Sequence, residues 1–452
     1  MFGRKRRTSA EIGPTINDVL SRCLHLGARK IKPPVHGMTS IDQPAKAPVG
    51  ESFTRLLTDP ARLKLFARCW IIVAPVIYLW DLLQQTRLDL TDGIRRPFGD
   101  DFINYWSGPW LAVHERVREI YDFDAFHAFE TSVVGSHIDT YNYSYPPVLL
   151  LLTAPLALIP YVPALGVWLA ATWYAFYRAL KAASGEGALL LSLATPALFV
   201  SAVGGQNGAL TAALLCGGLV LLDRRPIVAG VLLGCLVYKP HLALILPFAL
   251  IAGRRWTTIV ATGTTAVLLV AMSVALFGLQ CWIDYAHNLD IFRVVTLEDG
   301  TGVWHRSMSI FVFARHVGAS VQAAYAVQAV FAIFAAIVVA RSWWRDDPAP
   351  VRNAMVIMGT CLITPYLQDY DLVMSAFVAV WLKQAGEEQE SVSPTAITAA
   401  MAAIMLAPLF AAPVAKATGF VLAAPVLVAV FVVLIALAQA PSTRGRALPA
   451  GA

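Results

Sequence analysis

Long apolar stretches, separated by short polar or basic segments, make up most of this chain between residues 61 and 440. An α-helix needs about 20 apolar residues to cross a bilayer, and many of these stretches approach that length. The pattern predicts an all-α polytopic membrane protein, a bundle of about twelve transmembrane helices. The expected spans lie near residues 63–83, 161–180, 187–203, 257–277, 321–341, 353–367, 371–384, 395–413 and 419–438, with one more before Arg224 and two short legs within 226–253.

Basic residues predict the orientation of these spans. Lys and Arg accumulate in short cytoplasmic loops, so the pairs Arg224-Arg225 and Arg254-Arg255 are expected inside. The resulting segments are a cytoplasmic N-terminal tail at 1–60, a transmembrane domain at 61–440 with outer loops at 85–145 and 278–308, and a cytoplasmic tail at 441–452.

The apolar segment 145–160 is not expected to span. It contains four prolines, which remove backbone donors and break helices. If it did span, Arg224-Arg225 would face outside, against the rule for positive charge. It is therefore expected to lie at the outer interface or to re-enter, and Gln206 and Asn207 then face outward.

The segment 226–253 runs between two basic pairs and must go out and return. Each leg has about 14 residues, or roughly 21 Å of helix, against a hydrocarbon core about 30 Å thick. The turn at Tyr238-Lys239-Pro240-His241 is therefore expected below the outer surface, inside protein or in a watery cleft. A Lys at such depth needs a partner, and short broken helices tend to line sites.

Composition agrees with a membrane protein and narrows the chemistry. The chain is 57% hydrophobic and 14% charged, whereas soluble domains have about 25% charged residues. The six cysteines are scattered, which supports neither a disulfide framework nor a zinc site. No nucleotide-binding motif is present, and the basic cluster Arg4–Arg7 is interpreted as part of the cytoplasmic tail, so no nucleic-acid partner is expected. No metal and no cofactor are expected.

Two adjacent carboxylates, Asp100 and Asp101, open the first outer loop beside aromatic residues. A carboxylate partly desolvated at a membrane surface can act as a general base on a hydroxyl. A solvated pair or a helix N-cap is the alternative interpretation. The residues alone leave the choice between the two aspartates open.

Four basic side chains are candidates for binding the phosphate of a lipid-linked donor, because a phosphate leaving group needs nearby cationic donors. The alternatives are a Lys that snorkels to the headgroups and an interfacial pair that binds anionic lipid. The candidates are Lys239, His241, His305 and Arg306.

Further polar and aromatic residues are candidates for binding the sugar or the acceptor. The alternatives are an aromatic belt, a glycine-capped turn between helices and a simple polar hairpin loop; the acidic pair near 370 could instead pair with Lys239. These candidates are Asp100, Tyr105, Tyr145, Gln206, Asn207, Asp369 and Asp371.

Several blocks of this sequence, in order, resemble glycosyltransferase family 87. They are Asp101-Phe102-Ile103-Asn104-Tyr105-Trp106 with Ile120-Tyr121-Asp122, Tyr145-Pro146-Pro147, Gly205-Gln206-Asn207, Tyr238-Lys239-Pro240 and Pro365–Asp371. The resemblance implies a GT-C fold with a catalytic carboxylate in the first outer loop, and similarity to polyprenyl-phosphate-mannose-dependent mannosyltransferases of bacterial envelope synthesis. It implies that Asp101 is the general base, since Asp100 lies outside the pattern.

The expected function is that of an inner-membrane hexosyltransferase that inverts the anomeric carbon. Its donor would be a polyprenyl-phosphate sugar and its acceptor a lipid or glycan hydroxyl on the outer face. The alternatives are a transporter or flippase of lipid-linked sugars and a structural membrane subunit. The polar residues gather in the outer loops and no internal repeat is evident, which favours the enzyme.

Overall fold

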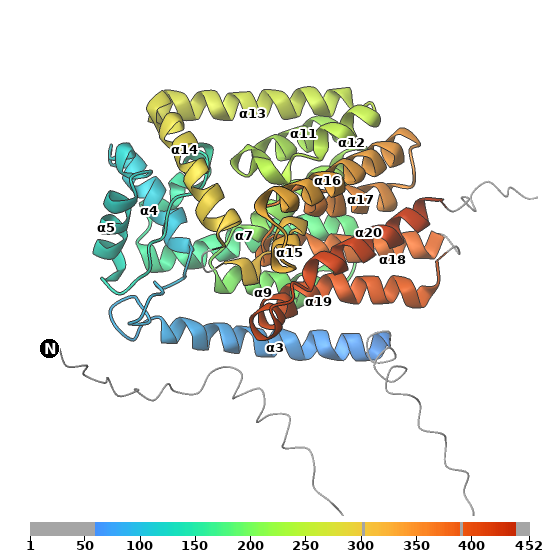
Figure 1. Cartoon of the computed structure of the whole chain (residues 1–452), viewed down its shortest axis with the longest axis horizontal. Coiled ribbons are helices and arrows are strands. Elements are labelled where there is room, and N and C mark those ends of the chain that lie inside the picture. The colour runs from blue at the N-terminus through green and yellow to red at the C-terminus, as the bar shows by residue number, and fades with distance from the viewer. Residues whose placement is uncertain (1–58, 301–302, 389–391, 440–452) are drawn as a thin grey trace, which may run out of the picture. The chain divides into compact units, whose positions relative to one another are not determined.

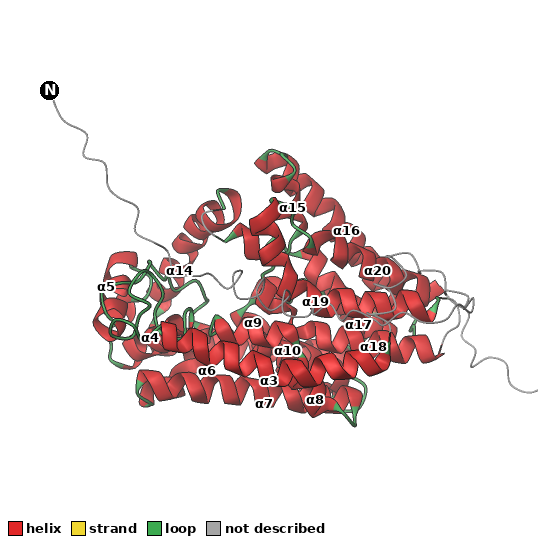
Figure 2. Ribbon diagram, turned by 90° about the horizontal axis from the view of Figure 1, so that it is seen from below, coloured by secondary structure: helices red, strands yellow, loops and turns green. Residues whose placement is uncertain are grey.

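The computed structural model describes residues 59–300, 303–388 and 392–439. These residues form helices and connecting loops, and the described part has no β-strand (Figure 2). The fold is therefore all-α, as predicted. Apart from residues 59 and 60, the predicted tails at 1–60 and 441–452 lie outside the described residues.

Within the described residues, four helices are long and apolar enough to cross a membrane. They coincide with predicted spans and indicate a membrane protein. Side chains of Asp59, Ser320 and Ser393 cap three of them by accepting backbone N–H groups. The four are α3 (Pro60–Gln84), α13 (Trp256–Phe277), α16 (Val321–Trp344) and α19 (Pro394–Thr418).

The remaining predicted spans also correspond to helices, although the count of about twelve spans stays a prediction. The span expected at 187–203 is broken at Thr195-Pro196 into two short helices, because proline cannot donate the helical hydrogen bond. The helices are α7 (Tyr161–Ser184), α8 (Ala188–Ala194), α9 (Pro196–Val203), α10 (Gly208–Leu221), α17 (Ala349–Ile363), α18 (Ser375–Glu388) and α20 (Ala423–Gln439).

The segment 226–253 forms the short broken helices that its length predicted. Two α-helices flank two 3₁₀ turns, and Lys239 lies buried between the turns. The elements are α11 (Pro226–Gly234), η3 (Cys235–Tyr238), η4 (Pro240–Leu242) and α12 (Leu246–Ala252).

The two predicted outer loops contain helices rather than extended polar chain. The helices α4, α5 and α14 lie together at one end of the drawing (Figure 1). Aromatic residues Phe102, Tyr105 and Trp106 of α4 are buried in a second apolar core there, separate from the core of the long helices. The elements are α4 (Phe102–Val113), η1 (Val117–Glu119), α5 (Phe123–Val134), α14 (Leu279–Phe292), the π-helical η5 (Arg293–Glu298) and η6 (Trp304–Arg306).

Three further short elements follow these loops in the sequence. Residues 145–160 form α6 (Val148–Thr153) and η2 (Ala154–Leu158), which together are shorter than the roughly 30 Å hydrocarbon core at about 1.5 Å per residue. After the second predicted outer loop comes α15 (Ile310–His316).

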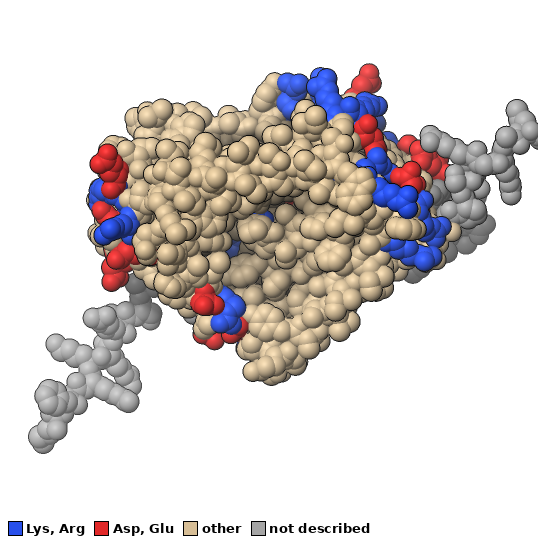
Figure 3. All heavy atoms as spheres, turned by 90° about the horizontal axis from the view of Figure 1, so that it is seen from above, with Lys and Arg blue, Asp and Glu red and all other residues tan. Residues whose placement is uncertain are grey.

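Charged side chains gather near both ends of the face drawn in Figure 3, with a smaller group at its lower edge, and leave a broad, largely uncharged band between them. At one end, Arg352 pairs with Asp223 and Asp346, and Arg255 pairs with Asp223. These ion pairs join the turns at Arg224-Arg225 and Arg254-Arg255, both expected on the cytoplasmic side, to the turn between α16 and α17. The three turns therefore lie on the same side of the protein, while the side of the membrane that they face stays a prediction.

Candidate active site

A cavity of about 420 Å³ lies where the outer loops meet the broken helices of 226–253 and the loop after α17. Figure 3 shows a hollow in the uncharged band with positively charged side chains inside it. The cations among the lining residues are Lys239 and Arg306. Predicted site residues that line this cavity are Asp101, Tyr145, Gln206, Lys239, His241, Arg306 and Asp371.

Asp101 occupies the N-terminal position of α4 and its half-buried side chain faces the cavity. The amide of Gln206 donates a hydrogen bond to its carboxylate. The other end of that amide accepts from Tyr105 Oη at 2.9 Å, and Tyr105 Oη lies 2.6 Å from Tyr145 Oη. Because the Gln206 carbonyl is engaged by Tyr105, its NH₂ group is turned toward Asp101. Tyr105, which is buried behind the cavity wall, thus fixes the orientation of the Gln206 amide.

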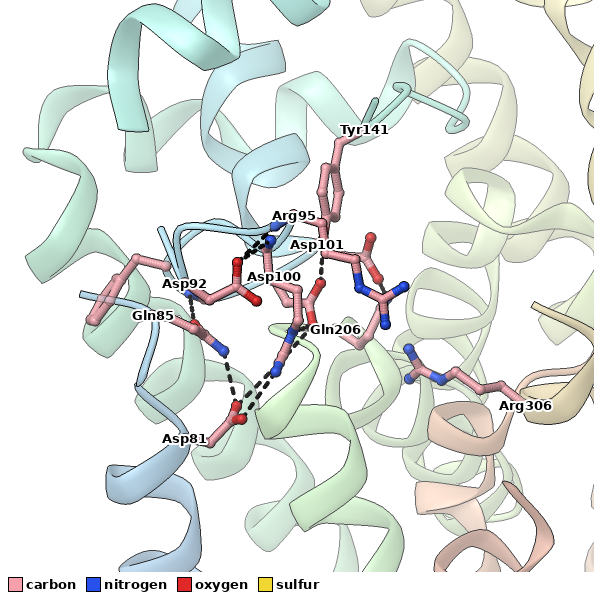
Figure 4. A network of polar contacts seen from close by, with 12 residues as sticks. Asp81, Gln85, Asp92, Arg95, Asp100, Asp101, Tyr141, Gln206 and Arg306 are labelled. Atoms are coloured by element: carbon pink, nitrogen blue, oxygen red, sulfur yellow. Dashed lines mark hydrogen bonds and ion pairs between the residues drawn. The ribbon is translucent and has the colours of Figure 1, made fainter. Parts of the chain in front are cut away.

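Asp100 points in a different direction from its neighbour (Figure 4). Its carboxylate accepts from Arg96 at 3.0 Å and from Tyr141 Oη at 2.6 Å. Among the described residues, those that line the cavity do not include Asp100. The structure therefore distinguishes Asp101, which lines the cavity, from Asp100, a choice that the residue types alone left open.

Two glycines of the Gly204–Gly208 motif bring the loops of the site together. A Cβ atom on Gly205 would lie 2.2 Å from the carbonyl oxygen of Gly99, just before Asp100. A Cβ atom on Gly208 would lie 2.0 Å from the carbonyl oxygen of Tyr370. Only glycine permits both backbone approaches. A glycine-capped turn was the alternative interpretation of this motif, and here the same turn also places Gln206 and Asn207.

Lys239 is buried and has polar partners from two other segments. Its ammonium donates to Asn207 Oδ1 at 3.0 Å and to Asp371 Oδ1 at 2.5 Å. The pairing with an acidic residue near 370 was one of the predicted alternatives. An ammonium has three donors, so one remains beyond these two bonds. Asn207 is itself buried and contacts Lys239, but it is not among the described lining residues of the cavity.

Arg306 pairs with Asp369 in the same manner. Its Nε and Nη2 groups lie 3.1–3.2 Å from the Asp369 carboxylate oxygens. The Tyr370 ring, between the two aspartates in sequence, lies 5.6 Å from Arg306 Cζ and 4.8 Å from Lys239 Nζ. The sequence Asp369-Tyr370-Asp371 therefore holds both cations of the cavity, by charge and by its ring face.

The two candidate histidines are placed differently. His241 lines the cavity beside Lys239, and its ring centroid lies 6.0 Å from that of Tyr366. His305 precedes Arg306 in η6, but the described lining residues do not include it.

Burial is the largest influence on the carboxyl group of Asp101 and raises its pKa to about 7. The charge of Asp100 adds to this, while Arg306, the Gln206 hydrogen bond and Arg96 lower the pKa. Burial, followed by the charge of Asp101, also raises the pKa of Glu130 on α5 to about 10. The raised pKa of Asp101 is the direction of shift that a general base at neutral pH needs.

Several lining residues were not predicted as site residues. Tyr238 and Tyr370 stand inside motifs that the sequence singled out, so those motifs were a usable signal. Tyr285, Leu289 and Phe292 reach the cavity from α14, a helix in what the hydropathy pattern presented as a loop. The described residues contain no group of three or more His, Cys, Asp or Glu side chains arranged to hold a metal ion.

The chain matches the family model of glycosyltransferase family 87 over residues 143–365, just under half of its length. This match confirms the family resemblance and indicates a glycosyltransferase. The matched stretch includes Gln206, Lys239 and Arg306 but begins after Asp101. No curated protein and no solved structure matched the chain.

Proposed function

We propose, from the family match that indicates a glycosyltransferase, that this protein transfers a hexose from a polyprenyl-monophosphate donor to a hydroxyl group. Mannose is the first sugar to test, and the acceptor is a lipid or a glycan on the outer face of the bacterial inner membrane. The fold class would be GT-C. The family match does not favour the rival function, a flippase of lipid-linked sugars.

A single arrangement carries the proposal: one cavity has a carboxylate, Asp101, and two cations, Lys239 and Arg306, in its wall. A glycosyl transfer from a lipid phosphate needs a base for the acceptor hydroxyl and positive charge for the departing phosphate. These two needs match the two kinds of charged group around the cavity.

The cations keep donors for a ligand although each already has an acidic partner. The guanidinium of Arg306 uses Nε and Nη2 for Asp369, which leaves donors on Nη1 for a phosphate oxygen. Lys239 has a third ammonium proton beyond Asn207 and Asp371. In this proposal Asp369 and Asp371 orient the cations and do not touch the sugar, whereas His241 adds a neutral donor or acceptor beside Lys239.

The proposed reaction is a single displacement. Asp101 takes the proton of the acceptor hydroxyl, and the oxygen forms a bond to the anomeric carbon. The bond from that carbon to the phosphate oxygen breaks, and the lipid phosphate leaves with both electrons toward Arg306 and Lys239. One displacement inverts the anomeric configuration. Gln206 keeps the Asp101 carboxylate turned into the cavity, and Tyr145 offers a hydroxyl and a ring to the sugar.

A lipid-borne donor fits the apolar side of the cavity. Leu244, Leu289 and Phe292 belong to its wall. Leu244 is 47% exposed and Leu289 is 44% exposed, so apolar surface continues outward from the cavity. This surface would take the first isoprene units, since burial of apolar chain is favourable by about 25 cal/mol per Å².

The test is transfer by the purified protein from radiolabelled polyprenyl-phosphate-mannose to candidate lipid and glycan acceptors. Asp101→Asn should lower turnover by roughly 10²- to 10⁴-fold, the usual contribution of a general base. Asp139→Asn, an exposed aspartate of the same outer segment, should act like the wild type. Full activity of Asp101→Asn would remove Asp101 as the base. Translocation of the lipid-linked sugar in liposomes without any transfer would favour the flippase.

A further inference from the structure

The guanidinium of Arg96 lies between the carboxylates of Asp81 and Asp100. Figure 4 shows these two aspartates beside the proposed base, Asp101. Its Nη1 and Nη2 groups are 3.0 and 3.1 Å from the oxygens of Asp81, near the end of α3. Its Nε group is 3.0 Å from Asp100 Oδ2. The three side chains are only 17–27% exposed. One guanidinium therefore ties the long helix α3 to the residue before Asp101.

The same turn has further bonds to α3 and to the outer segment. Gly99 N donates to Gln85 Oε1 at 2.7 Å, and Gln85 Nε2 donates to Asp81 Oδ2 at 2.9 Å. Tyr141 Oη donates to the other oxygen of Asp100 at 2.6 Å. Both carboxylate oxygens of Asp100 are thus engaged, and each bond fixes the turn against a different part of the protein.

The backbone of this turn is unusual and needs such support. Gly99 has φ of +82° and Asp100 has φ of +54°. A left-handed conformation is uncommon for a residue with a side chain, though Asp and Asn tolerate it best. With Asp100 left-handed, its carboxylate bonds Arg96 while the next carboxylate, Asp101, enters the cavity. The two aspartates have different directions because of this one turn.

We propose that Asp81, Arg96 and Asp100 form a positioning unit that aims Asp101 into the cavity and sets the charge around it. The unit rests on the proposed function, in which Asp101 is the base. It assigns Asp100 a different role from the sugar or acceptor contact that the sequence predicted. None of the three residues is a catalytic residue, since they act through Asp101.

The charge around Asp101 comes from several elements, and a change at Arg96 alters one part of it. Arg96 and Asp100 belong to its own loop, and the remaining groups must stay unchanged for a clean test. The titratable and charged groups that act on Asp101 or are acted on by it are Arg96, Asp100, Arg306, Glu130, Tyr105, Tyr141, Tyr145 and Tyr370.

The test compares the pH dependence of kcat/KM in two variants with opposite expected shifts. Arg96→Met removes a positive charge and leaves Asp100 without its cation, so the pKa of Asp101 rises and the acidic limb of the profile moves up by about one pH unit. Asp100→Asn removes the neighbouring negative charge and tolerates the left-handed backbone, so the limb moves down. In Arg96→Met, kcat should also fall roughly 10- to 100-fold because the base is misplaced.

Three controls separate positioning from general damage. Arg96→Lys keeps the charge and should retain the wild-type acidic limb, with part of kcat lost with the bidentate geometry. Arg116→Met removes an arginine paired with Glu119 elsewhere in the outer segment and should leave both kcat and the pH profile unchanged. Unfolding temperatures in detergent show whether each variant folds. If Arg96→Met does not fold, Asp100→Asn still decides the proposal.

Two results would overturn the positioning unit. One is a pH profile that moves in neither variant. The other is an Asp100→Asn variant whose only change is a higher KM for sugar donor or acceptor, as a substrate contact predicts. A measurement that does not need catalysis tests the positioning unit separately from the proposed function. The infrared band of the Asp101 carboxyl group is identified by its loss in Asp101→Asn, and its intensity is then followed against pH in each variant. Opposite shifts of that band support the unit even if the wild type transfers no sugar, and unmoved bands refute it.

Discussion

Asp101 accepts a hydrogen bond from Gln206 and faces the cavity, whereas Asp100 bonds Arg96 and Tyr141. The residue types are identical and adjacent, so composition and hydropathy had no means of separating them. The separation comes from a left-handed backbone at Asp100, with φ of +54°. The family resemblance favoured Asp101 for a different reason, because Asp100 lies outside the family pattern.

Turnover should depend on pH through the protonation of Asp101. Burial raises the pKa of Asp101 to about 7, and a base must be deprotonated to accept a proton. Activity should therefore fall as the pH drops through about 7 and reach a plateau above it. The measurement is kcat/KM for the lipid donor against pH. A profile flat from pH 5 to 8 would mean that Asp101 does not titrate as the base, since an unperturbed Asp has a pKa of about 3.9.

The buried ion pair between Lys239 and Asp371 should contribute to the stability of the protein. Lys239→Met leaves the buried Asp371 carboxylate without its cation, which costs about 3–5 kcal/mol of unfolding free energy. The matched control is Lys383→Met, because Lys383 pairs with Glu387 at 68% and 66% exposure, where a pair contributes about 0–1 kcal/mol. Thermal unfolding in detergent measures both. If Lys239→Met and Lys383→Met had the same unfolding temperature, the Lys239–Asp371 pair would add no stability. If the double variant Lys239→Met with Asp371→Leu regained the stability that Lys239→Met lost, the unpaired Asp371 carboxylate would be the cause of the loss.

Among the elements, the long apolar helices were predictable and the outer helices were not. The spans near 63–83 and 257–277 match α3 and α13 within a few residues, because a lipid-facing helix must be apolar on nearly every side. Helix α4 is different: nine of its twelve residues are buried. A short helix enclosed by protein has no polar face, so it shows no helical period in the sequence.

The close approach of α10 to the loop at Tyr370 can be tested by a substitution at Gly208, the first residue of α10. Gly208→Ala should displace that loop, since the new Cβ atom would lie 2.0 Å from the Tyr370 carbonyl oxygen. We expect a loss of about 1–3 kcal/mol in unfolding free energy and roughly 100-fold lower turnover, because the loop holds both cations.

The control for Gly208→Ala is Gly166→Ala on α7, where a Cβ atom meets nothing within 4 Å among the described residues. In a helix interior, Ala is favoured over Gly by about 1 kcal/mol, so this variant should be neutral or slightly more stable. The two alanines are thus expected to have opposite effects. A Gly208→Ala variant as stable and active as Gly166→Ala would show that the loop at Tyr370 does not depend on this approach.

At the scale of the whole molecule, the site depends on contacts between distant parts of the sequence. Asp101 and Gln206 are 105 residues apart, and Lys239 and Asp371 are 132 residues apart. Local patterns do not determine such pairs. The sequence therefore singled out seven residues that line the cavity, among them Asp101, Lys239 and Arg306, but few of the hydrogen bonds between them. The depth argument for Lys239 is the exception, because it predicted that a buried cation needs a partner.

The orientation of the protein in the membrane can be tested by cysteine labelling, and the structure shows which positions are accessible for it. Asn207 is buried, so a cysteine there would not be reached from either side. Glu115 is exposed just after α4. Arg224 is exposed in the turn after α10, which the ion pairs of Asp223 join to Arg255 and Arg352. In the background for this test, alanine replaces Cys69, which is exposed, and Cys23, which lies outside the described residues. The four remaining cysteines are at least partly buried.

In this background, a membrane-impermeant maleimide should label Glu115→Cys in intact cells and Arg224→Cys only after permeabilisation. The physical reason is that Lys and Arg stay in cytoplasmic loops, and Arg255 and Arg352 share Asp223 with the turn of Arg224. Labelling in the reverse order would place α4 and the cavity beside it on the cytoplasmic side. The acceptor would then have to be cytoplasmic too, which would contradict transfer on the outer face while leaving the roles of Asp101, Lys239 and Arg306 untouched.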